Sequence, residues 1–156
     1  MSTRLLTLRG HSSILNPVAD GEEETKQRMG CPTTARSLEE RLQRGVAFKV
    51  EGNYEEAERE FKAVLGEDPN HPVAHRELGL VYYFTGMFDE SVEELKVAVL
   101  LDPSDLKARN DLALTYTTLG MMDEARTEFE AVLGIDPTNS VALRNMQYFD
   151  DFNHSR

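Results

Sequence analysis

The chain repeats itself with a fixed spacing of 34 residues. That spacing separates three Asp-Pro pairs and three glycines, namely Asp68-Pro69, Asp102-Pro103 and Asp136-Pro137, and Gly52, Gly86 and Gly120. A constant period of this size is typical of arrays in which each unit packs only on its neighbours. We therefore expect one elongated domain built from stacked units, whose function depends on its surface.

The segments between these landmarks are also related. Residues 53–70 and 121–138 share 10 identical residues out of 18. The middle copy, 87–104, keeps the apolar spacing but has Ser91 and Leu95 where the other two have alanine and phenylalanine. We predict that the middle copy has the loosest contact between its helices.

The apolar residues follow a helical period. Leu78 and Tyr82 are four residues apart, as are Leu112 and Tyr116, which places each pair on one stripe of a helix. Small residues recur at the centre of that stripe and on the facing helix: Gly45, Gly79 and Ala113, and Ala57 and Ala125. Small side chains there predict that the two helices of each unit approach closely.

Glycine and proline mark the ends of the helices. Each of the three periodic glycines follows a first helix, where we expect the left-handed conformation. Each periodic proline follows a second helix and prevents its continuation, and Ser104 or Thr138 beside it is predicted to cap the next helix. The predicted helices are 38–51, 54–66, 72–85, 88–100, 105–119 and 122–134, with a seventh at 139–150. Leu143, Met146 and Phe149 of the seventh are expected to cover the third unit.

These features resemble the tetratricopeptide repeat family. The residues that carry the resemblance are Gly45, Phe48, Gly52, Ala57, Phe61 and Pro69, then Gly79, Tyr82, Gly86, Leu95, Ala98 and Pro103, then Ala113, Tyr116, Gly120, Ala125, Phe129 and Pro137. The pattern covers about residues 38–138 and departs at Arg44 and Ser91. The resemblance implies an all-α, right-handed superhelical solenoid of three antiparallel helix pairs with a C-terminal capping helix. The expected division is a poorly ordered leader (1–37), repeats at about 38–71, 72–105 and 106–139, a cap (140–150) and a tail (151–156).

Charge narrows the classes of partner. The net charge is −11, and it divides into +1 for residues 1–37 and −12 for the remainder. An array of that sign repels phosphate groups, so nucleic acid and anionic membranes are not expected as partners. A single cysteine, Cys31, cannot form an internal disulfide, and the leader lacks the apolar run of a secretion signal. We expect a cytoplasmic protein.

No catalytic constellation is visible in the sequence. His71 and His75 are four residues apart and suit one helix face, but two ligands rarely suffice for a metal ion. The many acidic residues of the second helices are interpreted as a solvated surface. We therefore expect no enzyme activity, no metal and no cofactor.

The resemblance implies that first helices line a concave groove that binds peptides. The residues predicted for it are Leu42, Val46, Lys49, Arg76, Leu80, Tyr83, Phe84, Lys107, Asn110 and Leu114. Their apolar members favour an apolar or amphipathic peptide, with Arg76, Lys107 and Asn110 bonding its polar groups. The sequence thus predicts a protein interaction module that acts as an adaptor or scaffold.

A subset of the family grips the terminal carboxylate of heat-shock chaperones with two lysines, two asparagines and an arginine. Leu42, Val46, Glu77 and Asp111 occupy four of those places here, and only Lys107 is retained. A chaperone-tail clamp is therefore not predicted. Three alternatives stay open: a chaperone-like holder of a secretion-system client, a groove occupied by the leader itself, and a homo-oligomer joined end to end.

Overall fold

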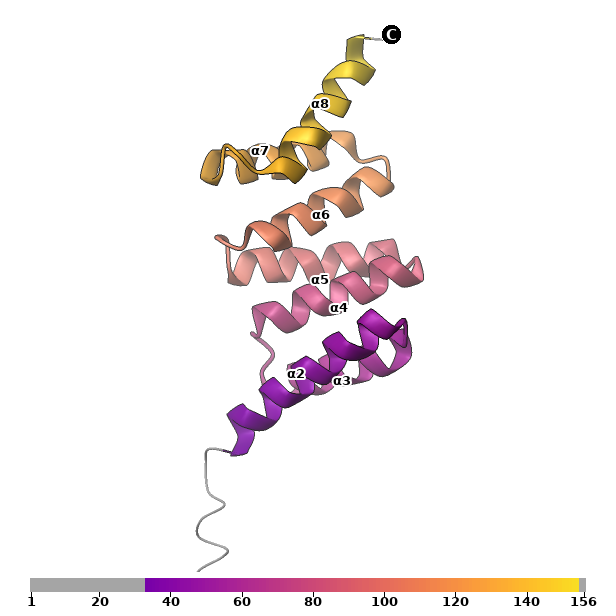
Figure 1. Ribbon diagram of the computed structural model, residues 1–156, viewed down its shortest axis with the longest axis vertical. Coiled ribbons are helices and arrows are strands. Elements are labelled where there is room, and N and C mark those ends of the chain that lie inside the picture. Colours follow the sequence, from indigo (N-terminus) through magenta and orange to yellow (C-terminus); the bar gives the residue numbers. More distant parts are fainter. Residues whose placement is uncertain (1–32, 155–156) are drawn as a thin grey trace, which may run out of the picture. The chain divides into compact units, whose positions relative to one another are not determined.

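The computed structural model of the protein describes residues 33–154, including the side chains of 37–151, and shows only helices and short turns there (Figure 1). The helices are α2 (Thr33–Glu51), α3 (Tyr54–Glu67), α4 (Pro72–Thr85), α5 (Phe88–Leu101), α6 (Leu106–Thr118), α7 (Met122–Ile135) and α8 (Ser140–His154). The all-α solenoid predicted from the 34-residue period is confirmed. The predicted leader up to residue 32, with the idea that it occupies the groove, falls outside the described residues.

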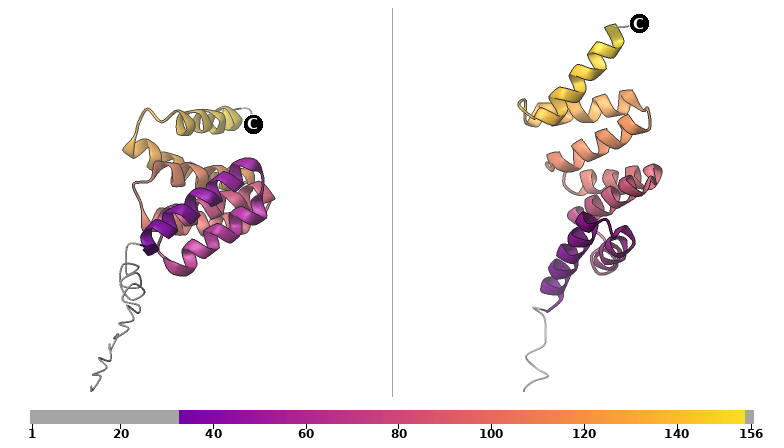
Figure 2. Two further views of the ribbon diagram at one scale, coloured as in Figure 1. Left: turned by 60° about the horizontal axis from the view of Figure 1, so that its bottom comes forward. Right: turned by 45° about the vertical axis from the view of Figure 1, so that its right-hand side comes forward.

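Helices that follow one another in the sequence also lie side by side (Figures 1 and 2). The helix α4 packs on α3 and α5, and α6 packs on α5 and α7, before α8 closes the series on α7. Each unit thus contributes a first helix (α2, α4 or α6) and a second helix (α3, α5 or α7). None of the described helices is long and apolar enough to cross a membrane.

Two helices are longer than the sequence predicted by more than one residue. The first begins at Thr33 instead of residue 38, directly after Pro32, where proline suits a helix start. The apolar periodicity begins only at Leu38, so it gave no sign of the preceding polar turn. The last helix continues to His154, through most of the segment predicted to be a tail. Residues 151–154 contain a single apolar residue, Phe152, so they carry no apolar period either.

The predicted turns and close contacts are confirmed. Gly52, Gly86 and Gly120 have φ angles of 82°, 81° and 76°, which is the left-handed region. A Cβ atom on Gly45 would lie 2.6 Å from Cε1 of Phe61, and one on Gly79 would lie 2.7 Å from Cγ of Leu95. Helices of one repeat therefore touch where the sequence places its small residues.

The predicted capping residues were wrong by one position. The hydroxyls of Ser104 and Thr138 each donate to the preceding aspartate, Asp102 or Asp136, over 2.7 Å. These hydroxyl bonds, together with bonds from the backbone of the same two residues, lower the pKa of both aspartates. Serine and threonine thus stabilise the turn before the helix rather than its first turn.

The caps themselves are the residues that follow. Asp105 accepts hydrogen bonds from the backbone N–H groups of Lys107 and Ala108 at the start of α6. His71 accepts one through Nδ1 at the start of α4, and Asn139 accepts one through Oδ1 at the start of α8. Each cap satisfies backbone donors that the helix leaves unpaired.

The core follows the repeats. One cluster of buried residues joins α2, α3 and α4, and a second joins α5 to α8. On α8, Met146 packs on the second cluster and Phe149 is buried, with its ring 6.1 Å from that of Phe129. The prediction for Leu143 was wrong, since its side chain is 47% exposed. Ala142, Met146 and Phe149 share the helix face toward α7, and Leu143 lies off that face.

Candidate interaction face

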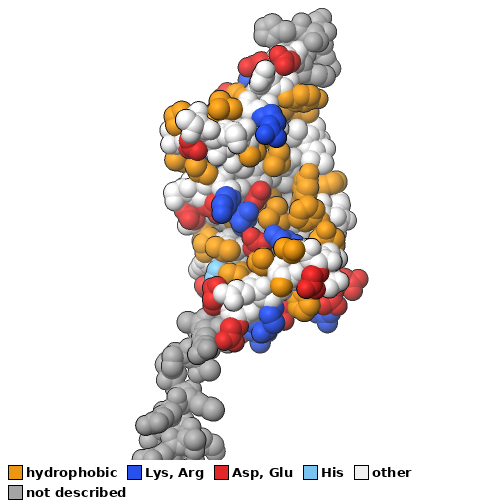
Figure 3. Space-filling model, in the orientation of Figure 1, with side chains coloured by type: hydrophobic (Ala, Val, Ile, Leu, Met, Phe, Trp, Pro, Cys, Tyr) orange, Lys and Arg blue, Asp and Glu red, His pale blue; other side chains and the backbone are white. Residues whose placement is uncertain are grey.

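All ten residues predicted for the groove lie on the first helices. Leu42, Val46 and Lys49 are on α2, Arg76, Leu80, Tyr83 and Phe84 on α4, and Lys107, Asn110 and Leu114 on α6. We call the surface that these three helices form the first-helix face. Figure 3 shows it with charged side chains near its middle and hydrophobic ones gathered toward the right.

A chain of ion pairs crosses this face. Lys49 of α2 bonds to Glu77 of α4, and the other oxygen of Glu77 accepts a 2.9 Å hydrogen bond from Arg76. The Nε of Arg76 in turn donates to Asp111 of α6 over 2.7 Å. The four side chains are between 8% and 18% exposed, so water screens them only partly. We call this set the ionic chain; it links all three repeats.

The ionic chain uses the cations that a ligand would need. Burial raises the pKa of the Asp111 carboxyl, and the Arg76 guanidinium opposes that rise. Releasing Arg76 to a ligand would leave Asp111 unpaired in a half-dry site and would leave Glu77 with Lys49 alone, which is costly. Arg76 and Lys49 are therefore committed to partners within the protein.

Four aromatic rings form a second feature at the C-terminal end of α4. The ring of Phe84 stacks on Tyr54 with centroids 5.9 Å apart, and Tyr83 meets Phe84 and Phe88 edge-on at 5.7 and 5.6 Å. Phe84 is 53% exposed although it is fully apolar. We call these four residues the aromatic cluster. Together with Val50, which is 80% exposed, it gives the face an apolar area open to a partner.

Other predicted residues have different surroundings. Leu80 and Leu114 are half-buried, and Tyr83 shares a 3.3 Å hydrogen bond with Thr118 of the next repeat. Val46 is partly buried against the N-terminal core cluster. Lys107 is exposed and forms no ion pair with any residue of 33–154. It is the predicted cation that a ligand can reach directly.

Two predicted residues are structural. Leu42 is 8% exposed and belongs to the core cluster of the first repeat. Asn110 is also 8% exposed, and its Nδ2 donates to Oδ1 of Asn139, which ties α6 to the start of α8. Equivalent positions of different repeats thus have different surroundings. A side chain that faces the groove in one repeat packs against a neighbouring helix in another.

His71 and His75 both have hydrogen-bond partners within the protein. His71 caps α4, while His75 has Nδ1 2.6 Å from Glu94 and Nε2 2.9 Å from the Pro69 carbonyl oxygen. Arg109 occupies the matching position in the third repeat and donates to Glu128 and to the Pro103 carbonyl. His75 therefore has a structural role, at the position that Arg109 occupies in the third repeat. Within the described part of the chain, no three His, Cys, Asp or Glu residues are grouped to hold a metal ion.

Sequence reasoning missed part of this face. Glu77 and Asp111 were considered only as mismatches to a chaperone clamp, although they occupy the same repeat position, 34 residues apart. A carboxylate repeated at one position beside a cation of the neighbouring unit was the signal for the ionic chain. Tyr54 and Phe88 were missed because they belong to second helices. Both begin their helix just after a turn, which brings them next to the end of α4.

Comparison with known proteins identifies the family to which this chain belongs. Sequence models described as tetratricopeptide repeat match residues 51–105 and 106–139, which is more than half of the chain. Together with the stacked antiparallel helix pairs, this establishes a helical repeat solenoid. The chain belongs to the tetratricopeptide repeat (TPR) family. No curated protein matches the sequence significantly.

Solved structures show the same fold. The first TPR domain of Spaghetti (RPAP3) bound to an HSP90 peptide is 22% identical, with a TM-score of 0.72 over 76% of this chain and 94% of that one. The second TPR domain of human RPAP3, in complex with an HSP70 peptide, is 26% identical, with a TM-score of 0.66 over 72% and 98%. The Sgt2 TPR domain from Aspergillus fumigatus is 17% identical, with a TM-score of 0.70 over 76% and 80%.

Proposed function

We propose that the first-helix face binds an apolar segment of a protein partner, and that the protein acts as a non-catalytic adaptor or scaffold. The observation that carries this proposal is the contrast on that face between paired charges and an exposed aromatic cluster. A partner that covers Phe84 and Val50 removes apolar surface from water, at about 25 cal/mol for each Å². Such burial requires no rearrangement of the ionic chain.

Two of the similar structures contain HSP90 or HSP70 peptides, which supports a peptide partner for this chain as well. The chemistry of the ligand differs in our proposal. Those two peptides, SRMEEVD and SGPTIEEVD, end in acidic residues. Here such a tail would meet Glu77 and Asp111, while Arg76 is already paired. Like charges brought together at an interface suppress binding of the wrong partner.

A peptide library displayed without a fixed C-terminus tests the proposal. It is panned on the wild type and counter-selected on Phe84→Ala, which removes the most exposed ring of the aromatic cluster. The enriched peptides should be rich in Leu, Phe and Met and should lose affinity about tenfold or more for Phe84→Ala. SRMEEVD and SGPTIEEVD should bind at least about tenfold more weakly than the enriched peptides.

The matched control is Glu130→Ala, an exposed change on the second helix α7. It should leave the affinity of the enriched peptides unchanged. Equal binding to wild type and Phe84→Ala would contradict the proposed face. Tight binding of the two acidic peptides would contradict the proposed ligand chemistry but not the face.

A further inference from the structure

The repeats meet at two equivalent junctions, and a third lies between the last repeat and the cap. At each junction one side chain of a second helix faces the following first helix. Glu58 of α3 accepts a 3.3 Å hydrogen bond from the hydroxyl of Tyr82 on α4. Arg126 of α7 pairs with Asp150 of α8 at 3.2 Å and lies over the Phe149 ring at 5.7 Å. Polar contacts thus close the first and last junctions.

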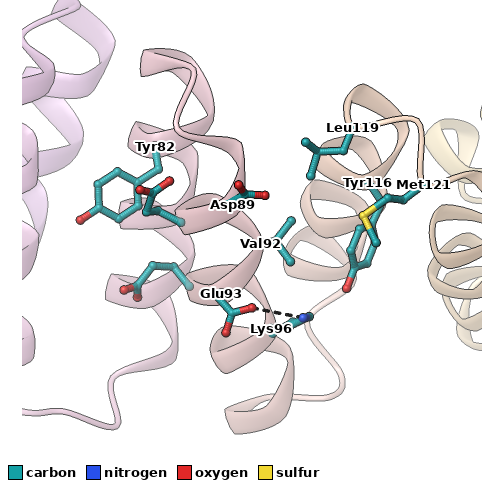
Figure 4. A pocket seen from close by; sticks show the side chains of 10 residues that line it. Tyr82, Asp89, Val92, Glu93, Lys96, Tyr116, Leu119 and Met121 are labelled. Carbon is teal, nitrogen blue, oxygen red and sulfur yellow. Dashed lines mark hydrogen bonds and ion pairs between the residues drawn. The ribbon is translucent and has the colours of Figure 1, made fainter.

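The middle junction is different because Val92 of α5 occupies this position. Val92 points toward Tyr116 of α6 and offers it no polar group, and the Tyr116 hydroxyl interacts with Lys96 of α5 instead (Figure 4). A recess of about 540 Å³ opens there, with Val92 and Tyr116 as its buried floor. Leu119 and Met121 border it and are 37% and 38% exposed. Its volume is within the range of about 300 to 1,000 Å³ typical of ligand sites.

The rim of this recess is acidic. Asp89, Glu90 and Glu93 line it, and the one lysine there, Lys96, pairs with Glu93 at 3.2 Å. Asp89 and Glu90 form no ion pair with any residue that the structure describes. The rim therefore carries uncompensated negative charge beside apolar side chains.

The first repeat shows what a neutralised version looks like. A smaller recess of about 340 Å³ is lined by Phe48, Glu56, Glu60 and two arginines, and it corresponds only to the acidic rim of the middle recess, not to its apolar floor. One of these, Arg59, stands where the middle repeat has Glu93, and it pairs with Glu56 at 2.8 Å. The middle repeat thus differs from the first at two positions of this recess, with Val92 in place of Glu58 on the floor and Glu93 in place of Arg59 on the rim.

We propose that this recess is a second docking site, separate from the first-helix face, for a basic amphipathic segment of a partner protein. A bulky apolar side chain of the partner would cover Val92, Leu119 and Met121. A lysine or arginine one helical turn away would pair with Asp89 or Glu90. Charge complementarity selects this occupant, because the acidic rim repels an acidic segment and an anionic membrane alike.

Val92→Glu gives a sharp test because it copies Glu58 of the first repeat. The probe is a fluorescein-labelled amphipathic helix made only of Leu and Lys, and its binding is followed by anisotropy at physiological salt. Val92→Glu should weaken binding about tenfold or more, although it adds a negative charge that favours a cationic probe in general. Gln147→Glu adds the same charge on α8 and should leave the affinity unchanged or slightly higher. Nonspecific attraction predicts no such difference.

Two further variants keep the test decisive. Leu119→Ala changes a half-exposed side chain, so it preserves the fold if Val92→Glu does not, and it should also weaken the probe. Because the first-helix face is itself proposed to bind apolar segments, all variants are also measured in a Phe84→Ala background, which separates this site from the proposed function. Undiminished affinity in both Val92→Glu and Leu119→Ala, or complete loss of binding in Phe84→Ala alone, would overturn the proposal. So would a wild-type dimer in sedimentation that Val92→Glu dissociates, because the occupant would then be a second copy.

Discussion

The outer repeats and the middle repeat have the same backbone arrangement but differ in the side chains that pack between their helices. In the first and third repeats, a buried phenylalanine and a buried alanine form the contact between helices. The middle repeat uses Leu95 and Ser91 at the same places. It also has His75 where the others have Arg41 and Arg109, and Val92 where they have a charged residue.

These differences show that the repeat pattern specifies the fold more strictly than it specifies each contact. Leucine and serine still let α4 and α5 pack closely, because Gly79 leaves room for Leu95, so the prediction that the middle repeat has the loosest helix contact was wrong. The middle repeat thereby changes its surface chemistry at little cost to its architecture. Four substitutions test this comparison, from the largest expected effect to the smallest.

Phe129→Ala should be the most damaging of them. Its ring is fully buried and contacts the Phe149 ring of the cap, so truncation leaves a cavity and should cost about 3 to 5 kcal/mol in the free energy of unfolding. Urea denaturation measures the loss. Leu95→Ala is the matched change in the middle repeat and should cost less, because it removes fewer buried carbon atoms. An equal or larger loss for Leu95→Ala would break the comparison.

Gly79→Ala should destabilise the middle repeat by about 1 to 3 kcal/mol in urea denaturation. The added Cβ would lie 2.7 Å from Cγ of Leu95 and 3.3 Å from the Ser91 carbonyl oxygen, so Leu95 must move. Gly66→Ala is the control, since an added Cβ there meets nothing within 4 Å. That control should be neutral or stabilise α3 by up to about 1 kcal/mol. Similar losses for both variants would mean that the contact with Leu95 is unimportant.

Ser91→Ala should stabilise the protein by about 1 kcal/mol or more, measured as a rise in the urea midpoint. The hydroxyl of Ser91 is fully buried and has no hydrogen-bond partner among the described residues. Alanine already occupies this place in the other repeats, as Ala57 and Ala125, both 0% exposed. The reverse change, Ala125→Ser, should destabilise the third repeat. A stabilising Ala125→Ser would contradict the interpretation.

His75→Arg should give the smallest effect, a gain of about 0.5 to 1 kcal/mol near pH 7.5. Both ring nitrogens of His75 face acceptors, whereas the guanidinium of an arginine always carries enough N–H groups to donate to both. Arg109 donates to both of the equivalent acceptors. Arg109→His should therefore lose a similar amount, and thermal unfolding of both variants checks the pair. A loss in both would show that the two positions are not equivalent.

Much of the fold was predictable from the sequence because it depends on residues that repeat. The period located the turns at Gly52, Gly86 and Gly120, and all three have the predicted backbone conformation. The start of α2 was not predictable, since the turn before Leu38 carries no apolar period. The caps were misassigned because Ser104 and Thr138 are good capping residues by type, yet Asp102 and Asp136 engage their hydroxyls first.

The first-helix face was predicted less completely than the fold. The helices that form it were assigned correctly, because membership of a first helix follows from the period. Whether a side chain on these helices is free to bind a ligand depends on its contacts with the neighbouring repeats. The sequence of one repeat does not determine those contacts. Arg76 was predicted to bond a ligand, but its partners lie at positions 77 and 111, one of them in the next unit. Val92 was not predicted as a site residue, because valine is ordinary in a helix core. It stands out only when it is compared with Glu58 and Arg126 at the equivalent positions.

The ionic chain also affects how the array unfolds. In a linear stack, stability is the sum of the repeats' own terms and of terms between adjacent repeats. Lys49 with Glu77, and Arg76 with Asp111, add an electrostatic contribution to both boundaries between repeats, and the bond from Arg76 to Glu77 joins the two contributions. Unfolding of one end repeat would therefore weaken the electrostatic attachment of the other end repeat to the middle one. The three repeats should accordingly melt as a single cooperative unit at low ionic strength and lose part of that cooperativity as salt is added.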